Sequence, residues 1–183
     1  MKKITTPLTD DIVRSLKAGD EVAISGIVYT ARDAAHKRLC ELLEQGKELP
    51  IPIKGQVFYF VGPTPAPPGA VIGSAGPTTS SRMDNFSPIL LAAGLKGMIG
   101  KGYRSDAVRD VLKKHCAVHF AALGGAGALL SQYIVSAETA AYEDLGTEAI
   151  RKLEVKDFPA VVAYDCFGGS VFKMEGATKT QRH

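Results

Sequence analysis

Strand-like and helix-like segments alternate along the first three quarters of this chain, and this alternation limits the fold more than any other feature. Residues 21–30 (EVAISGIVYT) are rich in β-branched side chains and predict a strand. Residues 31–45 follow directly with apolar positions at helical spacing, and Gly46 fits the end of that helix. Further strands are expected at 57–61, 97–100 and 117–123, and further helices at 10–17, 80–93, 105–115 and 128–137. Within 80–93, Pro88 either kinks the helix or is the first residue of a second one capped by Ser87.

The last part of the chain instead predicts β structure. Short strands are expected at 151–155 and 160–164, and a turn at 165–170 leads into a strand at 171–174. The turn also explains Asp165, although a catalytic role is an alternative. Alternation followed by a β-rich end predicts a layered α/β fold. We expect one domain over residues 1–183, with a disordered tail at 175–183.

The composition argues against several classes of protein. A net charge of +3 and few aromatic residues make a nucleic-acid partner unexpected. No apolar run is long enough to span a bilayer, and the first residues, MKKITTPLTDD, lack the apolar region of a signal peptide. The three cysteines, Cys40, Cys116 and Cys166, lie far apart, so no disulfide framework is expected. These features predict a cytoplasmic protein.

A loop rich in proline and glycine, residues 62–77, precedes the most suggestive motif, GPTTSSRMD at 76–84. Loops of this length inside a domain are usually functional or disordered, and we favour an ordered binding loop because prolines stiffen it. Thr78 and Thr79 stand at a predicted helix start, with Arg82 one turn further. Free N–H groups, hydroxyls and a guanidinium would form a pocket for a carboxylate or a phosphate.

Two more cations are predicted at strand ends near this pocket. Arg32 lies in the first turn after the strand at 21–30, and Lys101 follows the strand at 97–100; open α/β sheets place ligand residues there. Arg32 could instead be solvated or paired with Asp33. His36, one helical turn after Arg32, could reach the pocket or serve only in packing. The glycine turn at 124–127 lacks phosphate-loop spacing and is better explained by tight packing.

The candidate pocket therefore suits a ligand with two negative groups, and either a dicarboxylate or a phosphorylated metabolite would fit. The catalytic groups are harder to find. No HExxH, GxSxG, Cys/His pair or carboxylate cluster accompanies the cations. The chain alone predicts an anion-binding half-site, and a partner would have to supply the remaining chemistry.

Three segments in this order and spacing carry a resemblance to a known family. They are SGIVYTARDAAHKR at 25–38, GSAGPTTSSRMD at 73–84 and GMIGKG at 97–102. Together they resemble the β subunit of class I fumarate hydratases, which is similar to the C-terminal domain of the single-chain enzymes and to the β subunit of L(+)-tartrate dehydratase. The resemblance covers nearly the whole chain and implies a swivelling β/β/α domain.

The resemblance also implies a cofactor and a partner. In this family the α subunit carries three cysteine ligands of a 4Fe–4S cluster, so the cysteines of this chain would not be ligands and this chain would hold no metal. An assembly of two α and two β subunits is implied. The implied reaction is the interconversion of malate and fumarate, with tartrate dehydration as the alternative. A non-catalytic anion-binding module is the alternative from another class.

Roles carry over to matching residues only. Arg32 would bind one substrate carboxylate, while Arg82 and Lys101 would bind and polarise the dicarboxylate, with Thr79 beside them. Thr78 would transfer a proton, or else only orient the substrate, since a threonine hydroxyl is a weak base unless cations favour its alkoxide. His36 and Asp33 would support these groups from behind.

Overall fold

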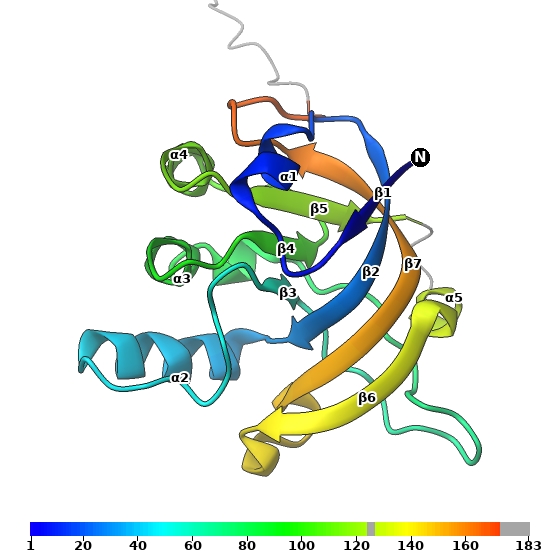
Figure 1. Ribbon diagram of the computed structural model, residues 1–183. Helices are drawn as coiled ribbons and strands as arrows, with labels where there is room; N and C mark the ends of the chain where they lie inside the picture. The colour runs from blue at the N-terminus through cyan, green and yellow to red at the C-terminus, as the bar shows by residue number, and fades with distance from the viewer. Residues whose placement is uncertain (124–126, 173–183) are drawn as a thin grey trace, which may run out of the picture.

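The computed structural model describes residues 1–123 and 127–172, and its centre is a barrel-like sheet (Figure 1). Strands β2, β3, β4 and β5 run parallel in that order, and antiparallel β7 closes the ring by pairing with both β5 and β2. β1 extends the sheet beside β2, and β6 extends it beside β7. The strands are β1 (Lys2–Thr5), β2 (Glu21–Thr30), β3 (Val57–Tyr59), β4 (Gly97–Gly100), β5 (Val118–Ala122), β6 (Ile134–Ala141) and β7 (Ile150–Tyr164).

The segment around β3 shows how the sequence produces two cores. Residues 57–61 are all buried, and alternate side chains point to opposite faces because a strand has a period of two. Val57, Tyr59 and Val61 enter the cluster inside the barrel, whereas Phe58 and Phe60 enter a second cluster outside it. The expected buried strand is therefore confirmed, and it is apolar throughout because both of its faces are covered.

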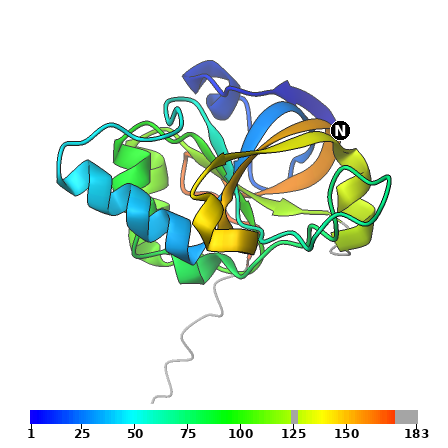
Figure 2. The ribbon, with the colours of Figure 1, turned by 90° about the horizontal axis from the view of Figure 1, so that it is seen from below.

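Three helices cover one outer face of the sheet, as Figures 1 and 2 show. Leu39, Leu90 and Leu112, one from each helix, lie in the outer cluster with Phe58 and Phe60. The opposite side of the barrel is formed by β2, β7 and β6. The helices on the covered face are α2 (Asp33–Glu44), α3 (Ser87–Ala92) and α4 (Asp106–Lys114); α1 (Asp10–Arg14) lies near β1, and α5 (Gly127–Leu130) near β6.

Several predicted elements are wrong in length or type. The segment expected as a helix at 80–93 is two elements, a 3₁₀ turn η1 (Ser80–Met83) and α3, which agrees with the alternative of a second start at Pro88. Pro88 falls in the first turn of α3, where its missing N–H does no harm. The helix expected at 128–137 ends at Leu130; η2 (Ser131–Tyr133) and β6 follow. Pairing with β7 overrides the local apolar pattern there.

The C-terminal part contains longer strands than predicted. The two strands expected at 151–155 and 160–164 form one strand, β7, which bends at Asp157 with φ 51°. It is preceded by η3 (Glu143–Glu148). Asp165 accepts hydrogen bonds from the N–H groups of Phe167 and Gly169, so its turn role is confirmed. The predictions for residues 124–126 and 173–183, including the second half of the strand expected at 171–174, lie outside the described residues, and residues 171–172 are not in a strand. No helix in the described ranges is both long and apolar enough to cross a membrane.

The result is a mixed α/β architecture with a barrel-like core. The prediction of an α/β class is confirmed, but the expected layered α/β fold did not include the closure of the sheet by β7. Closure depends on a pairing between β2 and β7 that joins residues about 130 positions apart, such as Val28 with Leu153. No local pattern encodes such a pairing.

Candidate active site

The GPTT segment lies in the sheet where β3 leaves it. Thr78 donates its backbone N–H to the carbonyl of Phe60 at 2.6 Å, directly after β3. Lys101, the residue after β4, donates its N–H to the carbonyl of Thr78 at 3.2 Å, and Ser80 donates to the carbonyl of Lys101 at 2.8 Å. Thr79 and Lys101 are thus parallel partners. The structure brings together the threonines and the lysine that the sequence placed 22 residues apart.

This pairing corrects the expectation of a helix N-terminus with free N–H groups. The N–H groups of Thr78 and Ser80 are already bonded within the sheet, and η1 is one short 3₁₀ turn without a side-chain cap. Its dipole is therefore too short to create an anion site. The half-buried Thr78 and the exposed side chains of Thr79, Arg82 and Lys101 remain as the groups that could contact a ligand.

Arg82 forms an ion pair with Asp33 at the start of α2. One carboxylate oxygen of Asp33 accepts from Nε and Nη2 of Arg82, at 3.0 and 2.7 Å. The sequence alternative paired Asp33 with Arg32 instead, so the partner was missed; only the tertiary structure brings η1 next to α2. Because Asp33 uses one edge of the guanidinium, the other edge is left to face a ligand.

Arg32 is the residue that precedes α2, not a residue of its first turn. Its side chain lies against Gly62, where a Cβ would come within 2.8 Å of Nη1 and 3.1 Å of Cδ. Arg32 Nε is 3.9 Å from a carboxylate oxygen of Glu148 in η3. Neither of these two buried atoms has a hydrogen-bond partner among the described residues. The Arg32 side chain thus lies beside the segment that follows β3, and its guanidinium still has a buried nitrogen that could donate a hydrogen bond.

His36 lies behind the site and not in it. Its side chain is fully buried, and Nδ1 donates to the carbonyl of Arg32 at 2.8 Å. Burial lowers the pKa of His36 to about 4, so the ring is neutral near pH 7. Its ring packs edge-on against Phe60, with centroids 5.2 Å apart. The structure therefore places His36 behind Arg32 in the core. A fully buried ring cannot exchange a proton with a ligand at the surface of the site.

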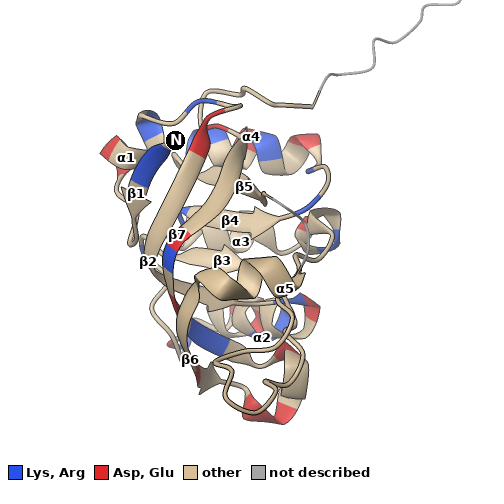
Figure 3. Cartoon of the chain, turned by 90° about the vertical axis from the view of Figure 1, so that its right-hand side faces the viewer, with Lys and Arg blue, Asp and Glu red and all other residues tan. Residues whose placement is uncertain are grey.

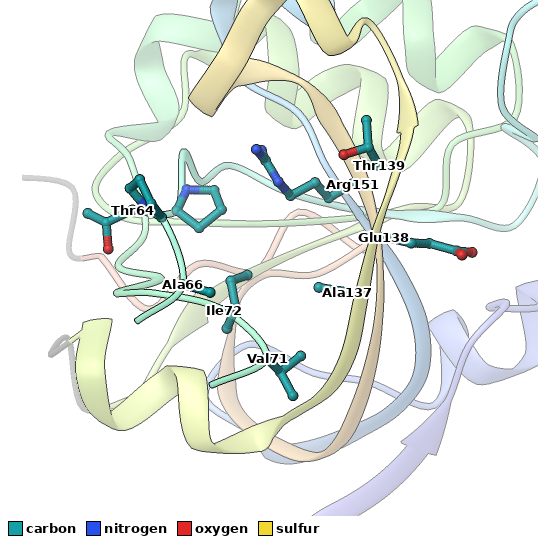
Figure 4. A pocket seen from close by; sticks show the side chains of 10 residues that line it. Thr64, Ala66, Val71, Ile72, Ala137, Glu138, Thr139 and Arg151 are labelled. Atoms are coloured by element: carbon teal, nitrogen blue, oxygen red, sulfur yellow. The ribbon is translucent and has the colours of Figure 1, made fainter. Parts of the chain in front are cut away.

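The loop at 62–77 is closed at its base. Thr64 donates its N–H to the carbonyl of Ser74 at 3.1 Å, and its hydroxyl accepts from the N–H of Ser74 at 2.8 Å. A cavity of about 140 Å³ separates this loop from β6 (Figure 4). Arg151 lines it, but its guanidinium donates to backbone carbonyls at 146, 147 and 149. None of the residues predicted for the anion site is among the described residues that line this cavity.

A buried polar network lies under η1, and the sequence patterns did not predict it. Arg104, three residues after Lys101, pairs with Asp84 at 2.7 Å, and its side chain has no exposed surface. In the sequence, Asp84 is only the last residue of the GPTTSSRMD motif. The one available signal was an arginine close after a strand end, which is also common on exposed surfaces.

The cysteines of this chain do not form a cluster site. Cys40 belongs to the outer core, whereas Cys166 belongs to the inner core with Cys116 against it. No group of three or more metal-ligating side chains occurs within residues 1–123 and 127–172. The donor set of the described chain therefore does not fit a 4Fe–4S cluster held by three cysteines.

Charged residues of both signs are interspersed on the side of the barrel that carries β7 and β6 (Figure 3). The cations of interest instead lie at the carboxyl ends of the parallel strands β2, β3 and β4. Arg32 follows β2, Thr78 bonds to the residue after β3, and Lys101 follows β4. The carboxyl ends of parallel strands are the usual place for a ligand site in an α/β domain.

Sequence comparison specifies that class further. The chain belongs to the Fumarase C-terminus family, whose model matches residues 2–175. It is 41% identical over 154 residues to an anaerobic class I fumarate hydratase of Escherichia coli. The aligned region covers 83% of this chain and 28% of that protein. It is 36% identical over 156 residues to fumarate hydratase 2 of Leishmania major, covering 84% and 28%.

A third relative has a similar length. A putative L(+)-tartrate dehydratase β subunit of Methanocaldococcus jannaschii is 33% identical over 172 residues, covering 91% of this chain and 88% of that protein. By contrast, the chain spans less than a third of the length of the fumarate hydratases it matches. The family resemblance seen in the motifs is confirmed.

Proposed function

We propose that this chain is the β subunit of a class I hydro-lyase that interconverts malate with fumarate and water. The observation that carries the proposal is the meeting of three separate segments at one sheet edge. Thr79 pairs with Lys101, and Arg82 is oriented by Asp33 beside Arg32. The names of the relatives, fumarate hydratase and tartrate dehydratase, support hydro-lyase chemistry. We also propose the cytoplasm as its location.

The cations would serve the two carboxylates of the substrate. Arg32, with its incompletely bonded Nε, would bind one carboxylate, while Arg82 and Lys101 would bind the other. Positive charge next to a carboxylate also stabilises the negative charge that develops when the adjacent carbon loses its proton. This division leaves Thr78, a half-buried residue, as the hydroxyl-bearing residue without an assigned carboxylate.

Thr78 would move the proton in our proposal. Dehydration removes a proton from one carbon of malate and hydroxide from its neighbour, and hydration reverses both steps. A threonine hydroxyl accepts a proton only as an alkoxide, so the role requires a nearby cation. Lys101 is our candidate for that cation, since its backbone N–H donates to the Thr78 carbonyl. If Thr78 only orients substrate, Thr78→Ser would retain most of the activity and Thr78→Ala would lose it only partly.

The remaining chemistry is assigned to a partner. A 4Fe–4S cluster would supply Lewis-acid polarisation of the substrate hydroxyl, and we assign it to an α subunit because Cys40 lies in a different core from Cys116 and Cys166, so the three cysteines here do not converge. An assembly of two α and two β subunits and a swivelling β/β/α description of this domain complete the proposal. The latter is supported by helices on one face of a barrel.

The test combines the purified chain with an α subunit that carries an intact cluster. Malate dehydration should require both chains, and Arg82→Ala should lower kcat/KM at least about 100-fold, the loss expected when a bidentate charged hydrogen bond to substrate is removed. Arg38→Ala removes an arginine of a different ion pair and should leave turnover unchanged. Hydration by the isolated, cluster-free chain would contradict the proposal.

Tartrate dehydration is the second candidate function. The relative named as a tartrate dehydratase β subunit matches this chain over 88% of its own length, which favours a separate subunit of this kind. Turnover of malate and of L(+)-tartrate by the same complex decides between them. Tight anion binding by the chain without any complex formation would instead support a non-catalytic module.

A further inference from the structure

Arg104 is a cation that no ligand can reach. Its side chain has no exposed surface, and it lies beneath η1. Nε donates to Asp84 at 2.7 Å and Nη2 donates to Ser87. Nη1 contacts both His119 Nδ1, at 3.2 Å, and the sulfur of Met98, at 3.3 Å. A buried guanidinium bonded through all three nitrogens has one fixed orientation.

The contact with Arg104 determines the tautomer of His119. A guanidinium can only donate hydrogen bonds, so His119 Nδ1 must accept. The proton of the neutral ring is therefore on Nε2, which donates to Ser80 Oγ at 3.2 Å. His119 is fully buried, so no water competes for either nitrogen. Through this ring, Arg104 fixes the side chain of Ser80.

The network holds both ends of the segment that carries Arg82. Ser80 is the first residue of η1 and Asp84 follows its last, so Arg104 contacts one end through His119 and the other end directly. The N–H of Ser105 donates to the second oxygen of Asp84 at 2.9 Å. The segment that starts at Lys101 is thus tied to the same carboxylate. Neither Ser80 nor Asp84 belongs to the group of residues assigned to substrate.

We propose that Arg104 is a positioning residue that holds Arg82 and Lys101 in one fixed relation, with His119 and Ser80 as the second connection. The proposal rests on the proposed function for the meaning of that relation. A buried charged pair is a poor source of stability, because removing both ions from water is expensive. What the Arg104–Asp84 pair contributes instead is a fixed orientation of the groups bound to it. Residues that surround a site commonly hold the ligand-contacting groups in place in this way.

Arg104→Lys tests this directly. Lysine keeps the charge beside Asp84 but cannot bond to Asp84, Ser87 and His119 together, so the chain should fold while the segment loosens. In the complex with the cluster-loaded α subunit, kcat/KM for malate should fall at least tenfold, with KM raised. Arg38→Lys, which alters a bidentate arginine paired with Asp144 on the surface, is the matched control and should stay within twofold.

A second measurement separates positioning from folding and from the proposed function. Amide hydrogen-exchange rates are measured in Arg104→Lys and in wild type at Ser80 and Lys101, whose backbone hydrogen bonds join the two segments. The amides of the β2–β7 ladder serve as the reference for global stability. Faster exchange at Ser80 and Lys101 alone supports positioning, whether or not the wild-type complex dehydrates malate. Unchanged exchange at both amides, or a folded Arg104→Lys complex with kcat/KM within twofold of wild type, would overturn it. An inactive wild-type complex contradicts only the proposed function.

If Arg104→Lys does not fold, His119→Gln supplies the same test. Glutamine can accept from Arg104 and donate to Ser80, whereas His119→Leu can do neither. The proposal expects His119→Gln to keep Ser80 protected and His119→Leu to lose that protection. Equal exchange at Ser80 in two folded variants would overturn the connection through His119.

Discussion

Asp33 accepts two hydrogen bonds from Arg82 through a single carboxylate oxygen, at 3.0 Å from Nε and 2.7 Å from Nη2. The two residues are 49 positions apart and belong to α2 and η1. The pair is partly exposed, with 35% of the Asp33 side chain and 50% of the Arg82 side chain accessible. Exposed pairs add little stability, so the effect of this pair should be the direction of Arg82.

We therefore predict that Asp33→Asn lowers kcat/KM by about threefold to tenfold, because freeing a long side chain costs about 0.5–1.5 kcal/mol when substrate must order it again. The unfolding midpoint should change by less than about 3 °C, since the lost pair is worth at most about 1 kcal/mol. Steady-state kinetics and thermal unfolding measure the two effects.

Asp144→Asn is the control for that variant. It breaks the pair with Arg38, which is also partly exposed and also begins on α2, but lies away from the candidate site. Its kcat/KM should match wild type. An equal loss of kcat/KM in Asp33→Asn and Asp144→Asn would show that the effect comes from removing any negative charge near α2, and not from the orientation of Arg82.

Gly100 should tolerate no side chain because Ser80 and Phe60 occupy the space beside it. A Cβ at Gly100 would lie 2.2 Å from Ser80 Oγ and 2.8 Å from Phe60. Gly100→Ala should therefore destabilise the fold by about 1–3 kcal/mol and displace η1. At Gly97, on the same strand, the nearest atoms are side-chain carbons of Val57 and Leu8 at 3.0 and 3.1 Å.

Gly97→Ala is thus the control, and it should alter activity much less at matched stability. Urea unfolding gives the stability and malate turnover gives the activity. If Gly100→Ala is as stable and as active as wild type, the tight packing of Ser80 on β4 is not needed by the site.

His36 should make stability depend on pH. Its pKa is lowered by burial from 6.5 to about 4, with the hydrogen bond to the Arg32 carbonyl opposing this and the Arg104 charge adding to it. Between pH 6.5 and 4 the unfolded chain binds a proton at this residue that the folded chain does not. Stability is therefore full above pH 6.5 and falls as the pH drops to 4, by about 3 kcal/mol at most.

Urea unfolding of wild type and His36→Gln at pH 7.5, 6, 5 and 4 measures this contribution. His119, whose pKa burial also lowers, adds loss of the same sign to both proteins. The difference between the two proteins therefore isolates His36 and should shrink as the pH falls. A constant difference across this range would contradict the burial of a neutral His36.

The cysteines provide a prediction about the cofactor. Cys40→Ala, Cys116→Ser and Cys166→Ala should each leave the iron content of the complex unchanged, because Cys40 lies in the outer core, away from Cys116 and Cys166 in the inner core, and the three thiols cannot bind one cluster together. Iron analysis and visible absorption of the purified complex measure it. Loss of iron in a variant that still folds and still binds the α subunit would place a cluster ligand in this chain.

The sequence by itself determined the local elements and the candidate groups. The β-branched run at 21–30 forms β2, the buried run at 57–61 contains β3, and Lys101 does follow the strand at 97–100. These features depend on the spacing of apolar side chains along the chain and on neighbouring residues, and both can be read from the sequence. The family also followed from short motifs whose spacing is local.

The tertiary structure alone decided the rest. Closure of the barrel depends on β2 pairing with β7, and β6 formed where the apolar pattern predicted a helix because an antiparallel partner was available. The Arg82–Asp33 pair and the Arg104 network join residues from separate elements. Hydrogen bonds and charges act over a few ångströms whatever the sequence distance, so the partner of each cation becomes known only when the chain is folded.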